Sequence, residues 1–329
     1  MRHVQRDTFD CSADEWLAAR NALIDLFSVQ HTASDCEQDP VALKPHGDSA
    51  QEADPATQSA QSIQKNQEQV LENTLGKTTA EHLALKQLPP DFKLSVVVPV
   101  FNEASTIEQV LHRLFELPIP LEVLIIDDGS RDGSRELLSD LIPEFSRHLP
   151  ASKSIHLGLH EGNLGKGAAL KTGFLKATGS IIAIQDADLE YDPMDFLWLL
   201  GPLLSGKADV VYGSRFSRGS HADSPFWHRW GNQLITLCSD LTTGLFWSDV
   251  ETCYKMVRTS IIKDIAPTLK ERGFGIELEL TAKLARYPNL TYYERPIRYQ
   301  KRGYAEGKKI GMKDAIWAAW CITRYRLAN

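Results

Sequence analysis

The chain of 329 residues carries 36 lysines and arginines against 43 aspartates and glutamates, a formal net charge of −7, and 43% of its residues are hydrophobic. Its mean hydropathy of −0.26 is typical of a soluble globular protein with one large domain or two ordinary ones. No apolar run approaches the roughly 20 residues of a membrane-spanning helix, and no secretory signal pattern follows Met1. The five cysteines are scattered without a CxxC pair, which argues against a disulfide framework and a zinc site. We therefore expect a cytoplasmic protein.

Residues 1–90 have the composition of an appendage. Ser12 and Glu15 have the spacing of a capping box, which predicts a short amphipathic helix up to about Leu26. Between Phe27 and Phe92 there is no aromatic residue, and glutamine, serine, threonine and acidic residues dominate. Such a stretch cannot bury enough apolar surface to order itself, so we expect it to be largely disordered.

From Leu94 onward short apolar runs alternate with amphipathic segments. Strands that are apolar throughout and separated by helices are typical of a mostly parallel sheet with helices on both faces, so the expected fold class is α/β. The expected strands are 94–100, 121–127, 154–159, 180–185 and 208–213, and the expected helices are 104–116, 131–145, 165–177 and 193–204.

In such a sheet ligands bind beyond the carboxyl ends of the strands. Each expected strand is followed there by polar, charged or glycine residues: 99–103, 127–130, 161–167, 186–188 and 213–215. Asp186 and Asp188 are two residues apart at a strand end, where both carboxylates can project to one side and share a cation. Hard oxygen ligands suit Mg²⁺ or Mn²⁺, which would bridge to a diphosphate.

The glycine-rich loop from Gly162 to Gly167 does not match the P-loop pattern. His160 stands where the first glycine should be, and Gly167 replaces the hydroxyl residue that would hold Mg²⁺. The first helix also lacks a GxGxxG opening, which argues against a dinucleotide-binding fold. Lys166 remains at a helix start, where it can approach a nucleotide or simply complete a tight turn.

The loops in this order resemble those of family 2 glycosyltransferases with a GT-A fold, a Rossmann-like architecture. Within that family they resemble the branch of dolichyl-phosphate mannose and glucose synthases and bacterial polyprenyl-phosphate glycosyltransferases. The resemblance runs from about Leu94 to Arg326, and its motifs are VVVPVFNE, IDDGSRDGS, GNLGKGAAL, DADLEYDP, YGSR, DVETCYK and RGYAEGKKI. It implies that residues 91–329 form the catalytic domain, ending in a basic amphipathic helix.

The resemblance also implies roles for individual residues. Asp186 and Asp188 are expected to hold Mg²⁺ or Mn²⁺, Asp127 to read the base or ribose, and Arg215, Arg302 and Lys308 to neutralise phosphates. The expected nucleotide-sugar site comprises Pro99, Phe101, Glu103, Asp127, Asp128, Lys166, Asp186, Ala187, Asp188 and Arg215. Phe101 and Glu190 stand where relatives often carry tyrosine and glutamine, so GDP-mannose and UDP-glucose both remain open as donors.

The acceptor decides whether a general base is needed. A sugar hydroxyl must be deprotonated, whereas a phosphate monoester arrives ionised because its second pKa is about 6. Asp249 and Glu251 are the base candidates, and Asp249 and Arg215 are the residues we expect to be catalytic. Glu277 and Glu279 stand at an expected helix start, which leaves open either a structural role favoured by the helix dipole or a role in the site.

The carboxyl-terminal segment from Arg295 onward holds nine basic residues against two acidic ones. Residues 308–327 combine tryptophans with cations, the composition of a helix lying on an anionic membrane or, equally, of an ordinary packed helix. Peripheral attachment to the inner face of the membrane is therefore one expectation, and we expect no nucleic-acid partner.

Three functions follow from these residues. The first is an inverting transferase that moves a hexose from a nucleotide sugar to polyprenyl or dolichyl phosphate. The second is a transferase of the same fold acting on a saccharide or other hydroxyl acceptor. The third is a catalytically silent module that binds a nucleotide sugar.

Overall fold

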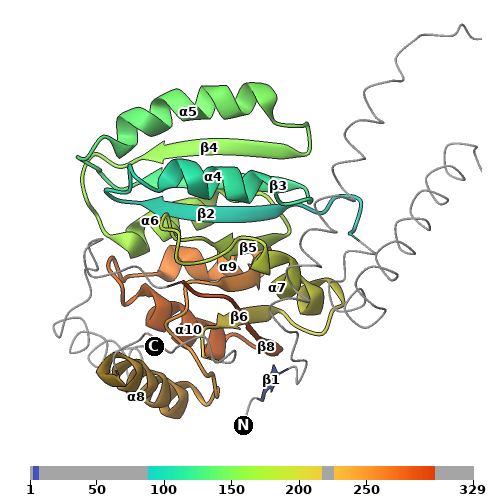
Figure 1. Ribbon diagram of the computed structural model, residues 1–329. Helices are drawn as coiled ribbons and strands as arrows, with labels where there is room; N and C mark the ends of the chain where they lie inside the picture. Colours follow the sequence, from blue (N-terminus) through green and yellow to red (C-terminus); the bar gives the residue numbers. More distant parts are fainter. Residues whose placement is uncertain (1–2, 7–87, 217–225, 301–329) are drawn as a thin grey trace, which may run out of the picture. The chain divides into compact units, whose positions relative to one another are not determined.

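The computed structural model describes residues 3–6, 88–216 and 226–300, and of residues 226–231 the backbone alone (Figure 1). The short helix expected near residues 12–26 and the basic helix expected at 308–327 lie outside these ranges. No helix within the described ranges is both long enough and apolar enough to cross a bilayer.

One sheet of eight strands organises the described part of the chain, in the order β1-β8-β6-β7-β5-β2-β3-β4 (Figure 1). Every neighbouring pair is parallel except the two that include β7, which runs against both β5 and β6. The strands are β1 (Val4–Arg6), β2 (Leu94–Val100), β3 (Leu121–Asp127), β4 (Lys153–Leu159), β5 (Ile181–Ile184), β6 (Val210–Ser214), β7 (Lys255–Arg258) and β8 (Tyr292–Pro296).

The central strands form where β-branched and other apolar residues occur in unbroken runs. All seven residues of β3 are buried, as are six of the seven in β2, so both faces of these strands are covered. The bounds predicted for these two strands are confirmed, and the other three predicted strands differ by one or two residues at their ends.

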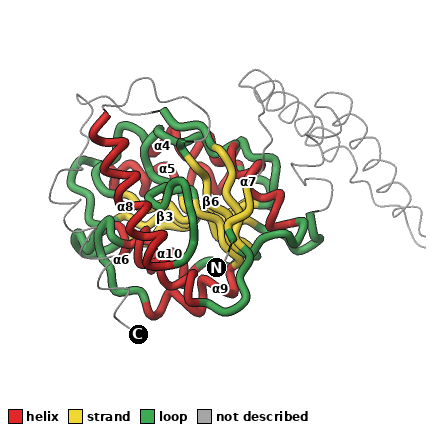
Figure 2. Tube along the Cα trace, turned by 90° about the horizontal axis from the view of Figure 1, so that it is seen from below, coloured by secondary structure: helices red, strands yellow, loops and turns green. Residues whose placement is uncertain are grey.

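Helices cover both faces of the sheet, and Figure 2 shows the strands enclosed between them. In α4 the buried residues Ile107, Val110, Leu111 and Leu114 recur at the spacing of one helix face. Helix α6 packs on β2 and β3, α5 on β4, α7 on β6 and β7, and α10 on α8 and α9. The helices are α4 (Ile107–Phe115), α5 (Ser134–His148), α6 (Lys166–Lys176), α7 (Asp195–Leu204), α8 (Phe226–Thr243), α9 (Thr259–Ile265) and α10 (Ile276–Arg286), with a 3-10 turn η3 (Ala266–Thr268).

Strand β7 is the main departure from a purely parallel sheet. Its residues Lys255 to Arg258 are too few to show a periodic pattern, and they directly follow the loop that carries Asp249. Because β7 is antiparallel to β5, its first residue lies at the edge where β5 ends. The loop of Asp249 and Glu251 therefore reaches the same edge of the sheet as Asp186.

Strand β1 changes the boundary expected for the appendage. Residues 1–90 were expected to lie apart from the catalytic domain, yet Val4, Gln5 and Arg6 pair in parallel with β8. Residues 4–6 are thus part of the eight-stranded sheet, because backbone pairing between strands does not require sequence proximity. Residues 7–87 lie outside the described ranges.

Candidate active site

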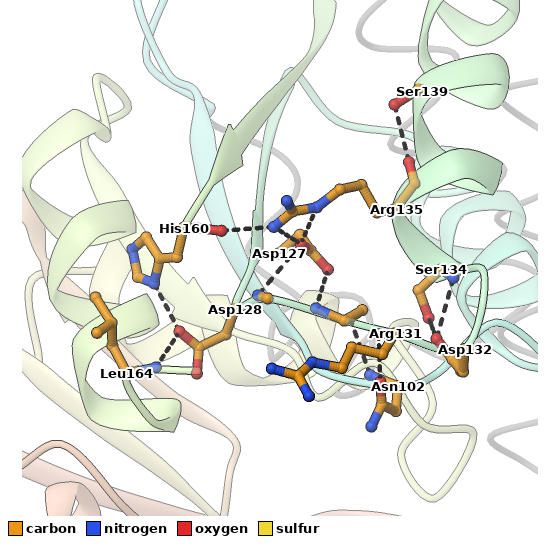
Figure 3. A network of polar contacts seen from close by, with 12 residues as sticks. Asn102, Asp127, Asp128, Arg131, Asp132, Ser134, Arg135, Ser139, His160 and Leu164 are labelled. Atoms are coloured by element: carbon orange, nitrogen blue, oxygen red, sulfur yellow. Dashed lines mark hydrogen bonds and ion pairs between the residues drawn. The ribbon is translucent and has the colours of Figure 1, made fainter. Parts of the chain in front are cut away.

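The loops that follow β2 and β3 are joined by side-chain hydrogen bonds (Figure 3). Asn102 Oδ1 accepts a hydrogen bond from the backbone amide of Arg131 at 2.8 Å, and the backbone amide of Asn102 donates to Ser130 Oγ at 3.0 Å. Asp132 accepts the amide of Ala104 at 3.0 Å. These contacts hold the two loops in one rigid arrangement at the carboxyl edge of the sheet.

Asp127 is fully buried and paired with a cation that the sequence analysis did not select. Arg135 donates to its Oδ2 from Nε at 2.8 Å and from Nη2 at 2.6 Å, and Nη2 also reaches the carbonyl oxygen of His160 at 2.5 Å (Figure 3). Arg135 therefore connects Asp127, at the end of β3, to the loop that follows β4. Arg135 stands eight residues later, inside the same IDDGSRDGSR stretch, and this spacing is the signal that could have identified it.

Asp128 fixes the glycine-rich loop. Its Oδ1 lies 2.6 Å from His160 Nδ1 and accepts the amide of Leu164 at 3.0 Å, while Oδ2 accepts the amide of Gly165 at 2.7 Å (Figure 3). Helix α6 begins at the next residue, Lys166. The structure therefore assigns Asp128 a positioning contact to the loop that presents Lys166.

Gly165 is required by close packing as well as by its backbone. Its φ is +98°, a conformation that L side chains rarely adopt, and an added Cβ would overlap the carbonyl oxygen of Arg272. The amide of Gly167 donates to that same carbonyl at 2.6 Å. The glycines thus serve a tight turn, and the turn directs Lys166 toward β5.

Lys166 lies between two carboxylates. Its Nζ is 2.8 Å from Asp186 Oδ1 and 2.9 Å from Glu277 Oε1. Burial alone would lower the pKa of this lysine, but Asp186 and Glu277 outweigh burial and hold the pKa well above its ordinary value. Lys166 is therefore a permanent cation at the end of β5.

Glu277, on the first turn of α10, belongs to this cluster as well as to the helix start. The residue is 6% exposed, and its Oε2 has no hydrogen-bond partner although it is buried. Glu279 has the structural role left open by the sequence, since its carboxylate accepts the amides of Lys270 and Glu271. Of the two acidic residues, only Glu277 reaches the site.

The two aspartates expected to hold a metal are both partly exposed beyond the end of β5. Asp186 contacts Lys166, and Asp188 accepts the amide of Glu190 on Oδ1 at 3.1 Å. Their carboxylate oxygens are the ligand type that Mg²⁺ and Mn²⁺ prefer, so this donor set fits such an ion. Among the residues that the structure describes, no three histidine, cysteine, aspartate or glutamate side chains gather as ligands for one ion.

Arg215 and Asp249 form a bidentate ion pair. Arg215 donates to Asp249 Oδ2 from Nε and to Oδ1 from Nη2, both at 2.7 Å, and its backbone amide adds a third contact at 3.1 Å. Burial would raise the pKa of Asp249, but Arg215 outweighs it and holds the pKa below its usual range. A carboxylate in this state is a weak proton acceptor, which disfavours the general-base role expected for Asp249.

The pKa of Glu251, two residues further on, is shifted in the opposite direction. Burial raises its pKa to about 7, and Arg215 offsets this only in part. The side chain is also partly exposed, unlike that of Asp249. Glu251 is therefore the carboxylate of this loop whose protonation changes near neutral pH, as a general base requires.

Lys255 holds the loop of Asp249 and Glu251 through hydrogen bonds to its backbone. Its buried Nζ donates to the carbonyl oxygens of Val250, at 2.9 Å, and Thr252, and lies 4.7 Å from the centre of the Tyr212 ring. Burial lowers its pKa to about 8. The sequence analysis did not select this lysine, because a lysine at a strand start carries no signal of burial.

The other expected residues fall around these contacts. Thr106 Oγ1 lies 2.9 Å from both Glu103 Oε2 and the carbonyl oxygen of Ala187, so the β2 and β5 loops meet. Pro99, Phe101 and Glu103 are partly exposed along this edge. Arg302 and Lys308 lie outside the described residues.

Comparison with known proteins identifies the family to which the chain belongs. The sequence model described as "Glycosyl transferase family 2" matches residues 95–266, which contain the loops of Asp127, Lys166, Asp186, Arg215 and Asp249. The chain belongs to glycosyl transferase family 2.

Curated relatives of the chain include undecaprenyl-phosphate 4-deoxy-4-formamido-L-arabinose transferases of Pseudomonas species. The chain is 30% identical to the one from Pseudomonas aeruginosa over 233 residues, which is 70% of this chain and 63% of that protein. It is also 30% identical to the one from Pseudomonas fluorescens over 224 residues, 67% of this chain and 61% of that protein. The chain thus spans less than two thirds of the length of these relatives.

Solved structures show the same fold. Glucosyl-3-phosphoglycerate synthase from Mycobacterium tuberculosis, in complex with Mn²⁺, UDP-glucose and phosphoglyceric acid, superposes with a TM-score of 0.51 at 18% identity, covering 76% of this chain and 82% of that one. Its complex with Mn²⁺, UDP and glucosyl-3-phosphoglycerate gives a TM-score of 0.50 at 20% identity, covering 75% and 83%. The GT-A fold expected from the sequence is therefore confirmed.

Proposed function

We propose that this glycosyltransferase moves a sugar, with inversion, from a nucleoside-diphosphate donor to a polyprenyl phosphate. The names of the Pseudomonas relatives support the acceptor class. The observation that carries the proposal is the Arg215–Asp249 pair, because it places a fixed guanidinium in the site and occupies the carboxylate that would otherwise act as the base. Such a site favours an acceptor that arrives already ionised.

The donor end is built to stabilise negative charge. Asp186 and Asp188 would hold Mg²⁺ or Mn²⁺, with the remaining ligands supplied by the donor diphosphate and water. A divalent ion there supplies charge stabilisation for the departing nucleoside diphosphate. Lys166 is a cation in contact with Asp186, and Arg215 adds a second fixed positive charge. GDP-mannose and UDP-glucose both remain proposed donors.

The acceptor end would be completed by Arg302 and Lys308, the residues expected to bind phosphate. A phosphate monoester with a second pKa of about 6 is ionised at neutral pH and attacks the anomeric carbon without a base. Its negative charge requires cations in the site, which Arg215 supplies among the described residues.

A hydroxyl acceptor is the second candidate, and Glu251 is the observation that favours it. This carboxylate has a pKa of about 7 and is partly exposed beside Arg215 and Asp249. It could accept a proton from an attacking hydroxyl at neutral pH. The two candidates therefore differ in whether Glu251 is needed.

We propose that the protein lies at the inner face of the membrane and contacts it peripherally. Helix α8 supports it: one face touches the site, where Asn232 Nδ2 lies 3.3 Å from Asp249 Oδ1. Its other face exposes leucines at helical spacing, which are Leu234, Leu237 and Leu241 at 62%, 52% and 68% exposure. A lipid-linked phosphate would then enter next to the surface that carries them.

The purified protein tests these proposals with a panel of nucleotide sugars, Mg²⁺ or Mn²⁺, and either undecaprenyl phosphate or simple sugars as acceptor. We expect transfer to undecaprenyl phosphate that stops in EDTA and in Asp188→Asn, with Asp140→Asn, an exposed carboxylate of α5, as the matched control. Arg302→Ala should weaken use of the lipid phosphate about ten- to a hundredfold. Transfer to sugars alone, or full activity in EDTA, would contradict the acceptor or the metal respectively.

A further inference from the structure

The short strand β1 brings one charged side chain to the edge of the sheet. In the register of β1 and β8, Arg6 stands opposite Glu294. Arg6 Nε donates to Glu294 Oε2 at 2.7 Å, and its Nη2 donates to the carbonyl oxygen of Phe246 at 2.5 Å. One guanidinium from the start of the chain therefore joins β8 to the loop that follows α8.

Glu294 is a buried carboxylate that uses both of its oxygens. Its side chain is 3% exposed, and while Oε2 meets Arg6, Oε1 accepts the amide of Ser248 at 2.8 Å. Burial raises the pKa of Glu294, and the Ser248 amide and Arg6 act against that rise. Because a buried carboxylate is strongly disfavoured without a cation, Arg6 favours the charged form of Glu294, which is the stronger acceptor for Ser248.

Ser248 leads directly to the site. Its hydroxyl lies 2.6 Å from the hydroxyl of Ser214 at the end of β6. The residues that follow these two serines are Asp249 and Arg215, which form the bidentate pair at 2.7 Å. The contacts from Arg6 through Glu294 and the two serines therefore set where the backbones carrying that pair approach each other.

A second buried acid, which also interacts with Arg6, accepts a hydrogen bond from the same loop. Asp240 is 6% exposed, and its Oδ1 accepts the amide of Trp247 at 3.1 Å. It interacts electrostatically with both Glu294 and Arg6. Both carboxylates accept backbone amides of residues 247–248, and the Arg6 guanidinium offsets the repulsion between them.

We propose that Arg6 is a positioning residue for sugar transfer, which acts through Glu294 and Ser248 to hold Asp249 and Arg215 in place. The inference rests on the proposed function, in which Arg215 stabilises charge on the leaving diphosphate. It gives the first residues of the chain a part in the site. In the sequence, residues 7–87 separate β1 from the other strands of the sheet. A variant that lacked everything before Leu88 would therefore lose the positioning contact of Arg6.

Full-length variants test this role. Arg6→Ala removes the cation, Arg6→Lys keeps the charge, and Gln5→Ala is the matched control because Gln5 is exposed on the same strand. Glu294→Gln removes the carboxylate charge while keeping an oxygen that can accept the Ser248 amide. Turnover of the donor is measured with whichever acceptor the wild-type enzyme uses, at a temperature where circular dichroism shows every variant folded.

We expect Arg6→Ala to lower kcat about tenfold with a smaller change in the donor KM, since Arg215 acts on charge that develops in the transition state. Gln5→Ala should match the wild type, and Arg6→Lys should recover most of kcat. The double variant Arg6→Ala/Glu294→Gln should be more active than Arg6→Ala, because the buried charge of Glu294 is removed together with its cation. This rescue would not follow if Arg6 only stabilised the fold through its packing.

Wild-type kcat in folded Arg6→Ala would overturn the inference, as would a double variant no better than Arg6→Ala. These outcomes are distinct from failure of the proposed function. That function fails if the wild-type enzyme transfers sugar to simple sugars and not to undecaprenyl phosphate, and the Arg6 series is then read with the sugar acceptor.

Discussion

The ammonium group of Lys166 lies 2.8 Å from a carboxylate oxygen of Asp186, the first of the two aspartates proposed to hold the divalent ion. The same ammonium lies 2.9 Å from Glu277. A lysine in this place occupies one oxygen that a metal ion would use. Lys166 and a bound ion would therefore compete for Asp186 until a donor diphosphate provided further ligands for the ion and a further partner for Lys166.

Lys166→Ala should tighten binding of Mn²⁺ to the protein without nucleotide and slow sugar transfer. Removing one positive charge next to Asp186 favours a cation there, by about 1 to 2 kcal/mol at an effective dielectric constant near that of a partly buried site. Titration calorimetry with Mn²⁺ alone measures the affinity. The matched control is Lys176→Ala, an exposed lysine at the other end of α6. An unchanged Mn²⁺ affinity in Lys166→Ala would refute the competition.

Glu251→Gln separates the two acceptor classes. If the acceptor is a polyprenyl phosphate, the variant should keep most of its transfer activity, because an ionised nucleophile needs no base. If the acceptor is a hydroxyl, activity should fall by a factor of about 10² to 10⁴. In that case the wild-type rate would also rise with pH through about 7, as Glu251 loses its proton, and this limb would vanish in the variant. Glu144→Gln, on the exposed face of α5, is the control.

Asp240→Asn should make the protein more stable at alkaline pH. Burial raises the pKa of Asp240 to about 7, against an ordinary value of about 4. The stability that this group contributes is fully present below pH 4 and is lost as the pH rises through about 7. The neutral asparagine can still accept the Trp247 amide, so we expect a gain on the order of 2 kcal/mol at pH 8 that shrinks toward pH 4.

Thermal denaturation across pH 4 to 8 measures this difference between Asp240→Asn and the wild type. Asp140→Asn, which replaces an exposed carboxylate, should show no such trend. A stability difference that stays constant with pH would show that Asp240 does not titrate in this range.

Leu237→Asp/Leu241→Asp should reduce binding to anionic phospholipid vesicles while leaving the fold intact. Both leucines are more than half exposed on α8, so the substitutions bury no charge in the protein, but they would place charge at the lipid surface. Co-sedimentation with vesicles is the measurement. Leu175→Asp on α6, where the leucine is 45% exposed, tests whether any exposed leucine has the same effect. Equal loss in that control would argue against α8 as the contact surface.

The sequence alone determined the strands and loops that are encoded locally. The apolar runs 94–100 and 121–127 form strands with the predicted bounds because each is buried on both faces, and burial of this kind needs no information from elsewhere in the chain. The motifs at the carboxyl ends of these strands are also short and local in the sequence, so they indicated the family without knowledge of the fold. The GT-A fold and membership of glycosyl transferase family 2 could thus be predicted from short stretches read in order.

Only the tertiary structure decided how the charged groups pair. Asp249 could be read as a base until Arg215, 34 residues away, was seen to occupy both of its oxygens. The pairing of Lys166 with Glu277, the burial of Lys255, and the placement of Arg6 beside Glu294 are likewise contacts between distant segments. A carboxylate is a base, a ligand or half of an ion pair according to its burial and its nearest cation, and both are set by the folding of the whole sheet.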